Sequence, residues 1–468
     1  MSVQTEIYLD TDQPCCIGVD IGTTNICAYV LQLSNGTPTA VYRMPNASDL
    51  PSLFAGDHRQ DADLLYRRVQ HLLDTVIAHY PCLCAIGFTG QMHGVLCTDK
   101  LGQALTPLYT WQDERAGQGT PSTCDEIWEK TGYRVSAGYG LATVYALMRD
   151  RQLPTDTARI CTVMDFVAAK LCGVPVIQMH TTNAASLGIY DTANQTFDAE
   201  ALCKIGIRPT WLPKVSDTIG IIGRYRGIPV TLPIGDNQAS FLGSVRDPET
   251  TVLANFGTGS QVSFLAPVDT VINNNSGSIE LRPFPGGRHL ICGSALCGGR
   301  AYALLERFFR TAFAEAGQEP GEPYVLLNRL AAEGLEQMHQ GGRSLSVKTT
   351  FCGTRDDPDS SGSITGIREE LFAPQALAVG VLRGMAEELY DMFCSVPHGH
   401  ITRLAASGNA VRENPVLCQV LAEMFGMPVQ IPAVQEEAAF GAAMTAAVGA
   451  GYAASVQELG GWVTYQIE

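Results

Sequence analysis

The chain has 468 residues, of which 46% are hydrophobic and 17% charged, a composition typical of a globular protein with a sizeable core. This length exceeds one compact core, so we expect two domains of roughly 200 residues each. The formal net charge of −16 argues against a nucleic-acid binder, because phosphate backbones are held mainly by Lys and Arg. A small phosphorylated ligand is still permitted, since backbone N–H groups and a divalent cation can hold it.

The cysteines and the apolar runs of the sequence indicate the cellular compartment in which we expect the protein. Fifteen cysteines is an odd number, and close pairs such as Cys82 and Cys84 lack the spacing of zinc or redox motifs. We therefore expect free thiols in a reducing cytosol. The first fourteen residues carry three acidic groups and no apolar core, unlike a secretory signal. The uncharged run Ala438–Gln457 is rich in Ala and Gly, so we expect a buried helix and its loop, with no membrane partner.

Two stretches about half a chain apart share one layout. In each, a short apolar run leads through an Asp or Asn into a turn of Gly and Thr, and an alternating stretch follows. This pattern predicts two β-hairpins of the same design and therefore two related domains. The first comprises Cys15–Val19, Asp20, the turn Gly22-Thr23-Thr24 and Ile26–Leu33; the second comprises Thr251–Ala254, Asn255, the turn Gly257-Thr258-Gly259-Ser260 and Gln261–Phe264.

The tips of these hairpins have a composition suited to phosphate. Glycine allows close backbone approach, and threonine hydroxyls and backbone N–H groups can donate to phosphate oxygens. Each tip taken alone is better explained as an ordinary turn, because Gly and Thr are common in turns. The duplication favours the functional interpretation.

The remaining elements indicate α/β layering in both halves. Helical periodicity predicts helices over 61–77, 142–151, 299–311, 374–393 and 415–425. Short apolar runs predict strands over 84–88, 228–234 and 402–406, and turn-rich composition predicts loops over 276–287 and 355–365. We expect a short hinge near 242–248.

An aspartate follows the predicted strand 228–234 at the point where a helix can begin. In the segment Pro233–Phe241, Asp236 comes directly after Gly235. A carboxylate on a rigid strand-to-helix turn can accept a proton from a substrate hydroxyl. Asp is also a favoured helix N-cap, and the spacing alone does not separate the two interpretations.

Three further segments combine polar groups with glycine or an aromatic ring. Gly87–Gly94 encloses donors and acceptors suited to a polyhydroxylated ligand, and its histidine has no partner at metal-ligand spacing. Tyr109–Arg115 offers the flat face of Trp111 and the acceptor Asp113, although the segment taken by itself is better explained as a surface loop with one anchoring tryptophan. Ala405–Ala410 could accommodate a flat ring against backbone. The pair before residue 438, Glu436 and Glu437, is better explained by the helix dipole.

Together these segments resemble the FGGY carbohydrate kinases. The resemblance spans nearly the whole chain, and eight blocks in the right order are far more specific than any one of them. That family has the actin-like ATPase fold of the α/β class, two ribonuclease-H-like domains with ATP and sugar in the cleft between them. The blocks are IGVDIGTTN, TGQMHG, TWQDERAG, PIGDNQASFLG, NFGTGS, CGGRAYALLERFF, ASGNAVRENP and EEAAFGAA.

The resemblance implies roles for the matching positions. It implies an N-terminal kinase domain over 1–242 and a C-terminal one over 243–468. It makes Asp236 the catalytic base and Asp20 the residue that holds Mg²⁺ through water. The sugar-binding positions it implies are Gln91, Met92, His93, Asp113, Asp236 and Asn237, and the ATP-binding positions are Thr23, Thr24, Gly257, Thr258, Gly259, Gly298, Gly408, Asn409 and Asn414.

Within the family, the segment VSAGYGLATVYALMR (135–149) together with TWQDERAG resembles the sedoheptulokinases. Xylulokinases share QMHG and the Trp-x-Asp pattern, so a pentulose is the alternative substrate. Glu114 departs from the family, which usually has Gly after this Asp, and the departure bears on the sugar and not on the reaction.

The expected reaction is in-line transfer from ATP to a primary hydroxyl of a ketose, in the cytoplasm, by an enzyme that could be a homodimer. An actin-like ATPase would share the phosphate hairpins and hydrolyse ATP without sugar. A non-catalytic sugar sensor would bind ligand without turnover, but the presence of Asp20, Asp236 and both phosphate loops argues against it.

Overall fold

The structure is a computed structural model, and it describes residues 3–9, 12–176, 178–268, 270, 277–319, 321–355, 357 and 359–466. The chain forms two compact units. The first comprises Met1–Arg246, Arg282–His289 and Glu436–Val463, and the second comprises Asp247–Leu281, Leu290–Gln435 and Thr464–Glu468. These units are not contiguous in sequence, so they do not coincide with the division into 1–242 and 243–468, which stays a prediction.

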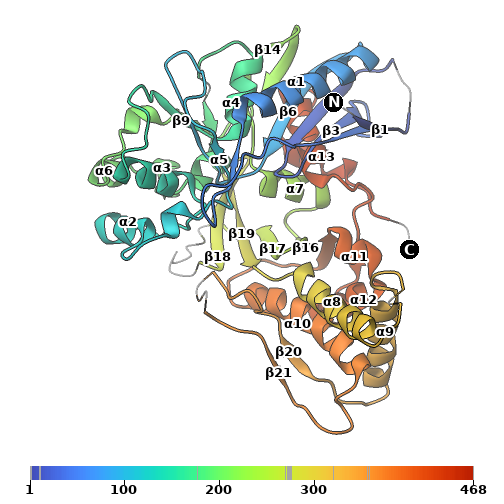
Figure 1. The fold of residues 1–468 in the computed structure, drawn as a ribbon. Coiled ribbons are helices and arrows are strands. Elements are labelled where there is room, and N and C mark those ends of the chain that lie inside the picture. The colour runs from blue at the N-terminus through green and yellow to red at the C-terminus, as the bar shows by residue number, and fades with distance from the viewer. Residues whose placement is uncertain are drawn as a thin grey trace. The chain divides into compact units, whose positions relative to one another are not determined.

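A mixed sheet forms the centre of the first unit (Figure 1). β2, β6 and β15 are parallel neighbours, and β3 runs antiparallel to both β2 and β4. The predicted first hairpin is confirmed as β2 and β3. The strand order is β1 (Gln4–Ile7), β4 (Pro38–Pro45), β3 (Asn25–Gln32), β2 (Cys15–Ile21), β6 (Leu83–Gly90), β15 (Ile228–Thr231) and β14 (Ile221–Tyr225).

Helices cover this sheet on both faces, as alternation along β2 requires. Ile17 and Val19 join the core formed with α1 (Ala62–His79) and α4 (Val163–Leu171). The intervening Cys16 donates its thiol to the Ala443 carbonyl of α13 (Glu437–Gly449), which also contacts α7 (Asp236–Ser244). The buried, Ala-rich α13 confirms the helix expected from residue 438 onward.

Smaller elements complete the first unit. They are β5 (Arg59–Gln60), β7 (Leu96–Thr98), β8 (Leu108–Tyr109), β9 (Arg159–Cys161), β10 (Met179–His180), β11 (Tyr190–Asp191), β12 (Thr196–Phe197), β13 (Val215–Ser216), α2 (Thr123–Thr131), α3 (Gly140–Arg149), α5 (Thr181–Ser186), α6 (Ala199–Lys204) and the 3₁₀ helices η1 (Arg115–Gly117), η2 (Pro209–Trp211) and η3 (Val456–Trp462).

The second unit repeats the strand order and directions of β4-β3-β2-β6-β15. β17 is antiparallel to β19 and β16, whereas β16, β22 and β23 are parallel neighbours. The second predicted hairpin is confirmed as β16 and β17. The order is β18 (Ile279–Phe284), β19 (Arg288–Ala295), β17 (Ser260–Leu265), β16 (Thr251–Phe256), β22 (Arg403–Ser407) and β23 (Val429–Gln430).

The helices of the second unit pack around α10, which contacts β17 and the neighbouring helices α8, α9 and α12 (Figure 1). The three helices predicted in this half are confirmed as α8, α10 and α12. The elements are α8 (Gly299–Glu315), α9 (Val325–His339), α10 (Pro374–Cys394), α11 (Asn409–Glu413), α12 (Pro415–Phe425), β20 (Ser346–Lys348) and β21 (Ser363–Thr365).

The two predicted loops were wrong in part. Within 276–287 the alternating stretch Ile279–Phe284 forms β18, and within 355–365 the end forms β21. Gly and Ser around these strands dominate the composition and hide the short alternation. Ser276, Asp356 and Pro358 lie outside the described residues. Within the described ranges, no helix is both long and apolar enough to cross a membrane.

Glycines allow α13 to approach β2 and β6 closely. A Cβ built on Gly18 would overlap the Ala439 carbonyl, and one on Gly87 would overlap the Ala442 carbonyl. The helix therefore rests on strand backbone with no side chain between, which a larger residue at either position would prevent.

We expect Gly87→Ala to destabilise the protein by about 1–3 kcal/mol, because the added methyl overpacks the contact with backbone that cannot move aside. Urea unfolding measures the change. Gly220→Ala is the matched control, since nothing lies within 4 Å of its added Cβ. Equal unfolding free energies for the two variants would contradict the close-packing argument.

Candidate active site

Three predicted site segments of the first unit lie at the carboxyl ends of neighbouring parallel strands. Asp20 is near the end of β2, Gln91 directly follows β6, and Asp236 follows β15 at the start of α7. Ligands of open α/β sheets bind at such strand ends. The strand order β2-β6-β15 thus brings together segments that are far apart in sequence.

Asp236 is the first residue of α7, and the N-cap position belongs to Gly235. The capping interpretation of Asp236 is therefore wrong, because the N-cap is the preceding residue. Backbone hydrogen bonds from Asn237 and Met92 fix the Asp236 carboxylate. Burial raises the pKa of Asp236 to about 6, although these bonds and the charge of Arg282 act in the opposite direction.

Asp20 faces the same region. Burial, with the nearby charges of Asp236 and Glu436, raises the pKa of Asp20 to about 8. Its Oδ1 atom is buried and accepts no hydrogen bond within the described part of the chain. An orphaned carboxylate oxygen beside a second carboxylate fits Mg²⁺, which prefers oxygen ligands and commonly uses one or two carboxylates with water and phosphate. The residues present therefore fit the expected ion.

The turn between β2 and β3 is held by amide side chains. The Gln60 amide donates to the Thr23 carbonyl (3.0 Å), and its oxygen accepts from Gln91 Nε2 (2.9 Å). Asn46 Nδ2 donates to the Gly22 carbonyl (2.8 Å). These bonds fix the predicted phosphate turn against the predicted sugar loop. Thr23 Oγ1 also lies 3.4 Å from Gln91 Oε1.

Trp111 extends this arrangement. Its indole N–H donates to Thr23 Oγ1 (3.0 Å), while 47% of the residue is exposed. An exposed ring held by a hydrogen bond offers a flat apolar face to a ligand. The alternative, a surface loop with one anchoring tryptophan, is also compatible with this hydrogen bond, so the sugar-binding role of the segment stays a prediction.

Asp113 is fully buried and bonded within the chain. Arg115 Nε donates to Asp113 Oδ1 (2.7 Å), and its Nη2 donates to Oδ2 (3.0 Å). The same guanidinium reaches Asp57 Oδ1 (2.9 Å) and lies over the Tyr109 ring. Asp113 therefore fixes its loop through Arg115, so its oxygens are already engaged before any sugar arrives.

Glu114 turns away from this ion pair. Its backbone N–H donates to the Gly56 carbonyl (2.8 Å), and its carboxylate lies over Gly56, where an added Cβ would come within 2.7 Å of Oε2. The side chain is exposed. The side chain of Glu114, which departs from the family pattern, thus packs against the 53–57 loop.

His93 sits in a left-handed conformation, with φ of 69°. Its ring stacks on Tyr139 at 4.6 Å between centroids, and its Nδ1 lies 2.8 Å from the Ser186 carbonyl. The ring serves to hold its loop, as expected of a hydrogen-bonding histidine. Met92, next to it, is buried against Gly235.

In the second unit, the turn between β16 and β17 lies on the start of α8. Gly299 N donates to the Gly257 carbonyl (2.9 Å), and Arg300 N donates to the Thr258 carbonyl (3.1 Å). A Cβ on Gly298 would overlap Gly259. The predicted residues Gly257, Thr258, Gly259 and Gly298 are therefore brought together.

The predicted adenosine residues lie beside that turn. β22 is parallel to β16, and at the end of β22 Gly408 adopts a φ of 95° with its Cα against Phe256 backbone. Asn409 begins α11. Asn414 caps α12 through Leu417 N (3.1 Å) and donates to Asn328 Oδ1 (3.1 Å), so its side chain is structurally engaged.

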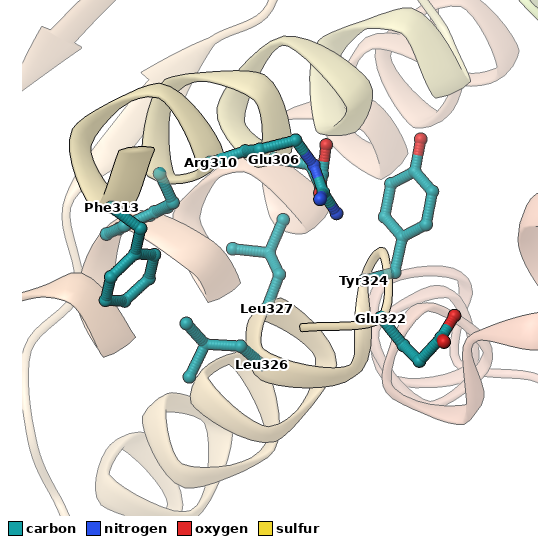
Figure 2. Close-up of a pocket in the computed structure, with 8 residues that line it drawn as sticks. Glu306, Arg310, Phe313, Glu322, Tyr324, Leu326 and Leu327 are labelled. Carbon is teal, nitrogen blue, oxygen red and sulfur yellow. The ribbon is translucent and has the colours of Figure 1, made fainter. Parts of the chain in front are cut away.

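A hollow opens between α8 and the start of α9 (Figure 2). Arg310 and Glu306 form an ion pair on its wall, opposite Tyr324. None of its lining residues was predicted to bind nucleotide. Tyr324 stacks on Tyr302, whose hydroxyl donates to Asn328. The hollow is thereby connected to the Asn414 network.

Several residues of the site were not predicted. Gln60 and Asn46 hold the first turn, and Arg282 places a positive charge near Asp236. Thr182 and Asn183 form hydrogen bonds with the backbone of the turn that precedes Asp236. Their signal in the sequence is weak, since none of them belongs to one of the glycine-containing segments that were predicted to bind ligand, and only the folded chain brings them to the site.

Family models match both halves of the chain. The N-terminal domain of the FGGY family of carbohydrate kinases matches residues 15–243, and its C-terminal domain matches residues 255–450. The chain belongs to the FGGY family of carbohydrate kinases. It is an enzyme that transfers a phosphoryl group from ATP to an alcohol group of a sugar.

Individual relatives agree with this assignment. Sedoheptulokinase from Mus musculus is 26% identical over 470 residues, covering 92% of this chain and 97% of the mouse protein. Glycerol kinase from Rhodospirillum rubrum is 27% identical over 481 residues, covering 96% and 92%. The crystal structure of xylulose kinase from Rhodospirillum rubrum matches with a TM-score of 0.82 at 22% identity, covering 96% and 93%. The fold is therefore the actin-like ATPase fold.

We expect Arg115→Met to lower the unfolding free energy by about 3 kcal/mol, because it leaves the buried Asp113 carboxylate without its partner. Urea unfolding measures the loss. Arg149→Met is the matched control, since the ion pairs of Arg149 with Glu126 and Asp150 are partly exposed to solvent and their loss should cost at most about 1 kcal/mol. A loss no larger than that of the control would contradict the structural role of the Asp113 pair.

Proposed function

We propose that this kinase phosphorylates a primary hydroxyl of a ketose, converting sedoheptulose to sedoheptulose 7-phosphate, with Asp236 as general base. One observation carries the assignment of the base: a carboxylate with a raised pKa is fixed by backbone N–H groups at the start of a helix, at the end of a parallel strand. The sugar-loop residue Met92 supplies one of those backbone groups. The substrate rests on the similarity to sedoheptulokinases.

The protonation state of Asp236 suits its task. With a pKa of about 6, the carboxylate is mostly ionised at neutral pH and is a stronger base than an ordinary aspartate. It takes the proton as the sugar oxygen attacks the γ-phosphorus of ATP, and ADP leaves. The fixed direction of the carboxylate confines this proton transfer to one hydroxyl.

The remaining predicted positions complete the proposal. Asp20 would hold Mg²⁺ through water, and the ion would neutralise charge on the phosphoryl oxygens. Asn237 and the 91–93 loop would contact the sugar, and Asp113 would orient the Trp111 loop beside it. The ATP phosphates would be bound by Thr23, Thr24, Gly257, Thr258, Gly259 and Gly298, and the adenosine by Gly408, Asn409 and Asn414.

We expect Asp236→Asn to lower kcat by about 10²- to 10⁴-fold, because the amide cannot accept the hydroxyl proton. Affinity for ADP, measured by calorimetry, should stay within about threefold. Asp99→Asn, on an exposed loop, is the control for the chemical change and should retain wild-type turnover. Near wild-type kcat in Asp236→Asn would reject the base assignment.

A coupled ADP-release assay across sedoheptulose, xylulose, ribulose, fructose and glycerol tests the substrate. We expect the highest kcat/KM for sedoheptulose. A clear preference for xylulose or ribulose would overturn the heptulose and leave a pentulose kinase. ADP release that does not depend on any sugar would instead indicate an ATPase.

A further inference from the structure

Helix α5 is a buried polar element that contacts the Asp236 turn and the His93 loop. Its six residues are Thr181–Ser186, and the side chains of Thr181, Thr182, Asn183 and Ser186 are almost fully buried. A six-residue helix gains little from its own backbone hydrogen bonds. Burying four polar side chains on it carries a desolvation cost unless each forms hydrogen bonds. Their partners therefore indicate what the helix does.

Thr182 bonds to the turn that carries Asp236. Its Oγ1 accepts the backbone N–H of Gly235 (3.0 Å), the residue directly before the base. The same oxygen lies 3.0 Å from His180 Nδ1, which also accepts the Thr182 N–H (3.2 Å). Burial lowers the pKa of His180 to about 4, so the ring is neutral at pH 7. Because Nδ1 accepts the Thr182 N–H, it carries no proton in the neutral ring, so the Thr182 hydroxyl donates to it and keeps a lone pair for Gly235.

Asn183 holds the other end of the same turn. Its Nδ2 donates to the Pro233 carbonyl (3.1 Å), and Asp165 Oδ1 lies 3.4 Å from the same nitrogen. Asp165 in turn accepts the Thr162 hydroxyl (2.7 Å). The Pro233–Gly235 backbone is therefore fixed on both sides by side chains of two consecutive residues.

Ser186 links the helix to the sugar loop. Its Oγ donates to the Asn183 carbonyl (2.8 Å) and accepts the His93 backbone N–H (3.3 Å). The Ser186 carbonyl lies 2.8 Å from His93 Nδ1. A single short helix thus contacts the turn that carries the base and the loop predicted to bind the sugar.

We propose that Thr182 and Asn183 are positioning residues that set the direction of the Asp236 carboxylate, and that α5 fixes it relative to the His93 loop. This rests on the proposed role of Asp236 as base. Neither side chain needs to touch the reacting atoms, because each forms its hydrogen bond with the backbone of residues 233–235. Loss of either should therefore affect the catalytic step more than binding.

Thr182→Val tests the proposal, since valine keeps the shape and removes the hydroxyl. We expect kcat to fall about tenfold or more, because small displacements of a catalytic group cost up to about 10²-fold. The sugar KM should stay within about threefold. Thr181→Val is the matched control, as this neighbouring buried hydroxyl donates to Asp217 instead (3.1 Å). Thermal unfolding should show similar shifts for both variants, and Thr182→Ser should restore kcat.

Asn183→Ala provides a second measurement and should also lower kcat more than it raises the sugar KM. In the Asp236→Asn background, adding Thr182→Val should cause no further loss of kcat, because the carboxylate that Thr182 positions is already absent. Equal kcat for Thr182→Val and Thr181→Val, with Asp236→Asn inactive, would overturn the positioning role alone. An active Asp236→Asn would overturn the base assignment and the positioning role together.

Discussion

The constraint on which the site depends is the placement of two half-buried carboxylates, Asp20 near the end of β2 and Asp236 just after β15, on the two sides of the parallel strand β6. Asp20 and Asp236 would both be ionised in water, and in the folded chain each has a raised pKa because solvent is withdrawn. Neither can move away, since the first is part of a central strand and the second starts a helix. The fold therefore disfavours the charged forms of both carboxyl groups, and a divalent cation bound beside them would favour ionisation.

The two units share one strand topology, and different residues follow their parallel strands. Both place Gly- and Thr-containing turns at the end of the first strand of a hairpin, next to a parallel strand. In the first unit the following strands lead to the proposed sugar loop and the proposed base Asp236, whereas in the second they lead to Gly408 and the α12 cap. The family match over 15–243 and 255–450 agrees with this duplication.

The hairpins, the position of Asp236 and the helices α1, α3, α8, α10, α12 and α13 could be predicted because each depends on local pattern. The role of Asp113 as a free acceptor could not be judged, since its partner Arg115 is visible only once the loop folds back. Likewise, Thr182 and Gln60 reach the site through long-range hydrogen bonds of the folded chain and not through neighbours in sequence. The strand β18 escaped prediction because its alternation is short and flanked by turn-forming residues.

The contact of α13 with Gly18 and Gly87 has a consequence for biosynthesis. This helix, Glu437–Gly449, belongs to the first unit although it is made among the last residues of the chain. Until it leaves the ribosome, one face of β2 and β6 has no cover, and the sheet exposes apolar surface for most of translation. The amino-terminal unit thus reaches its native core after the bulk of the second unit has been synthesised, and a chain that stops before residue 437 leaves it incomplete.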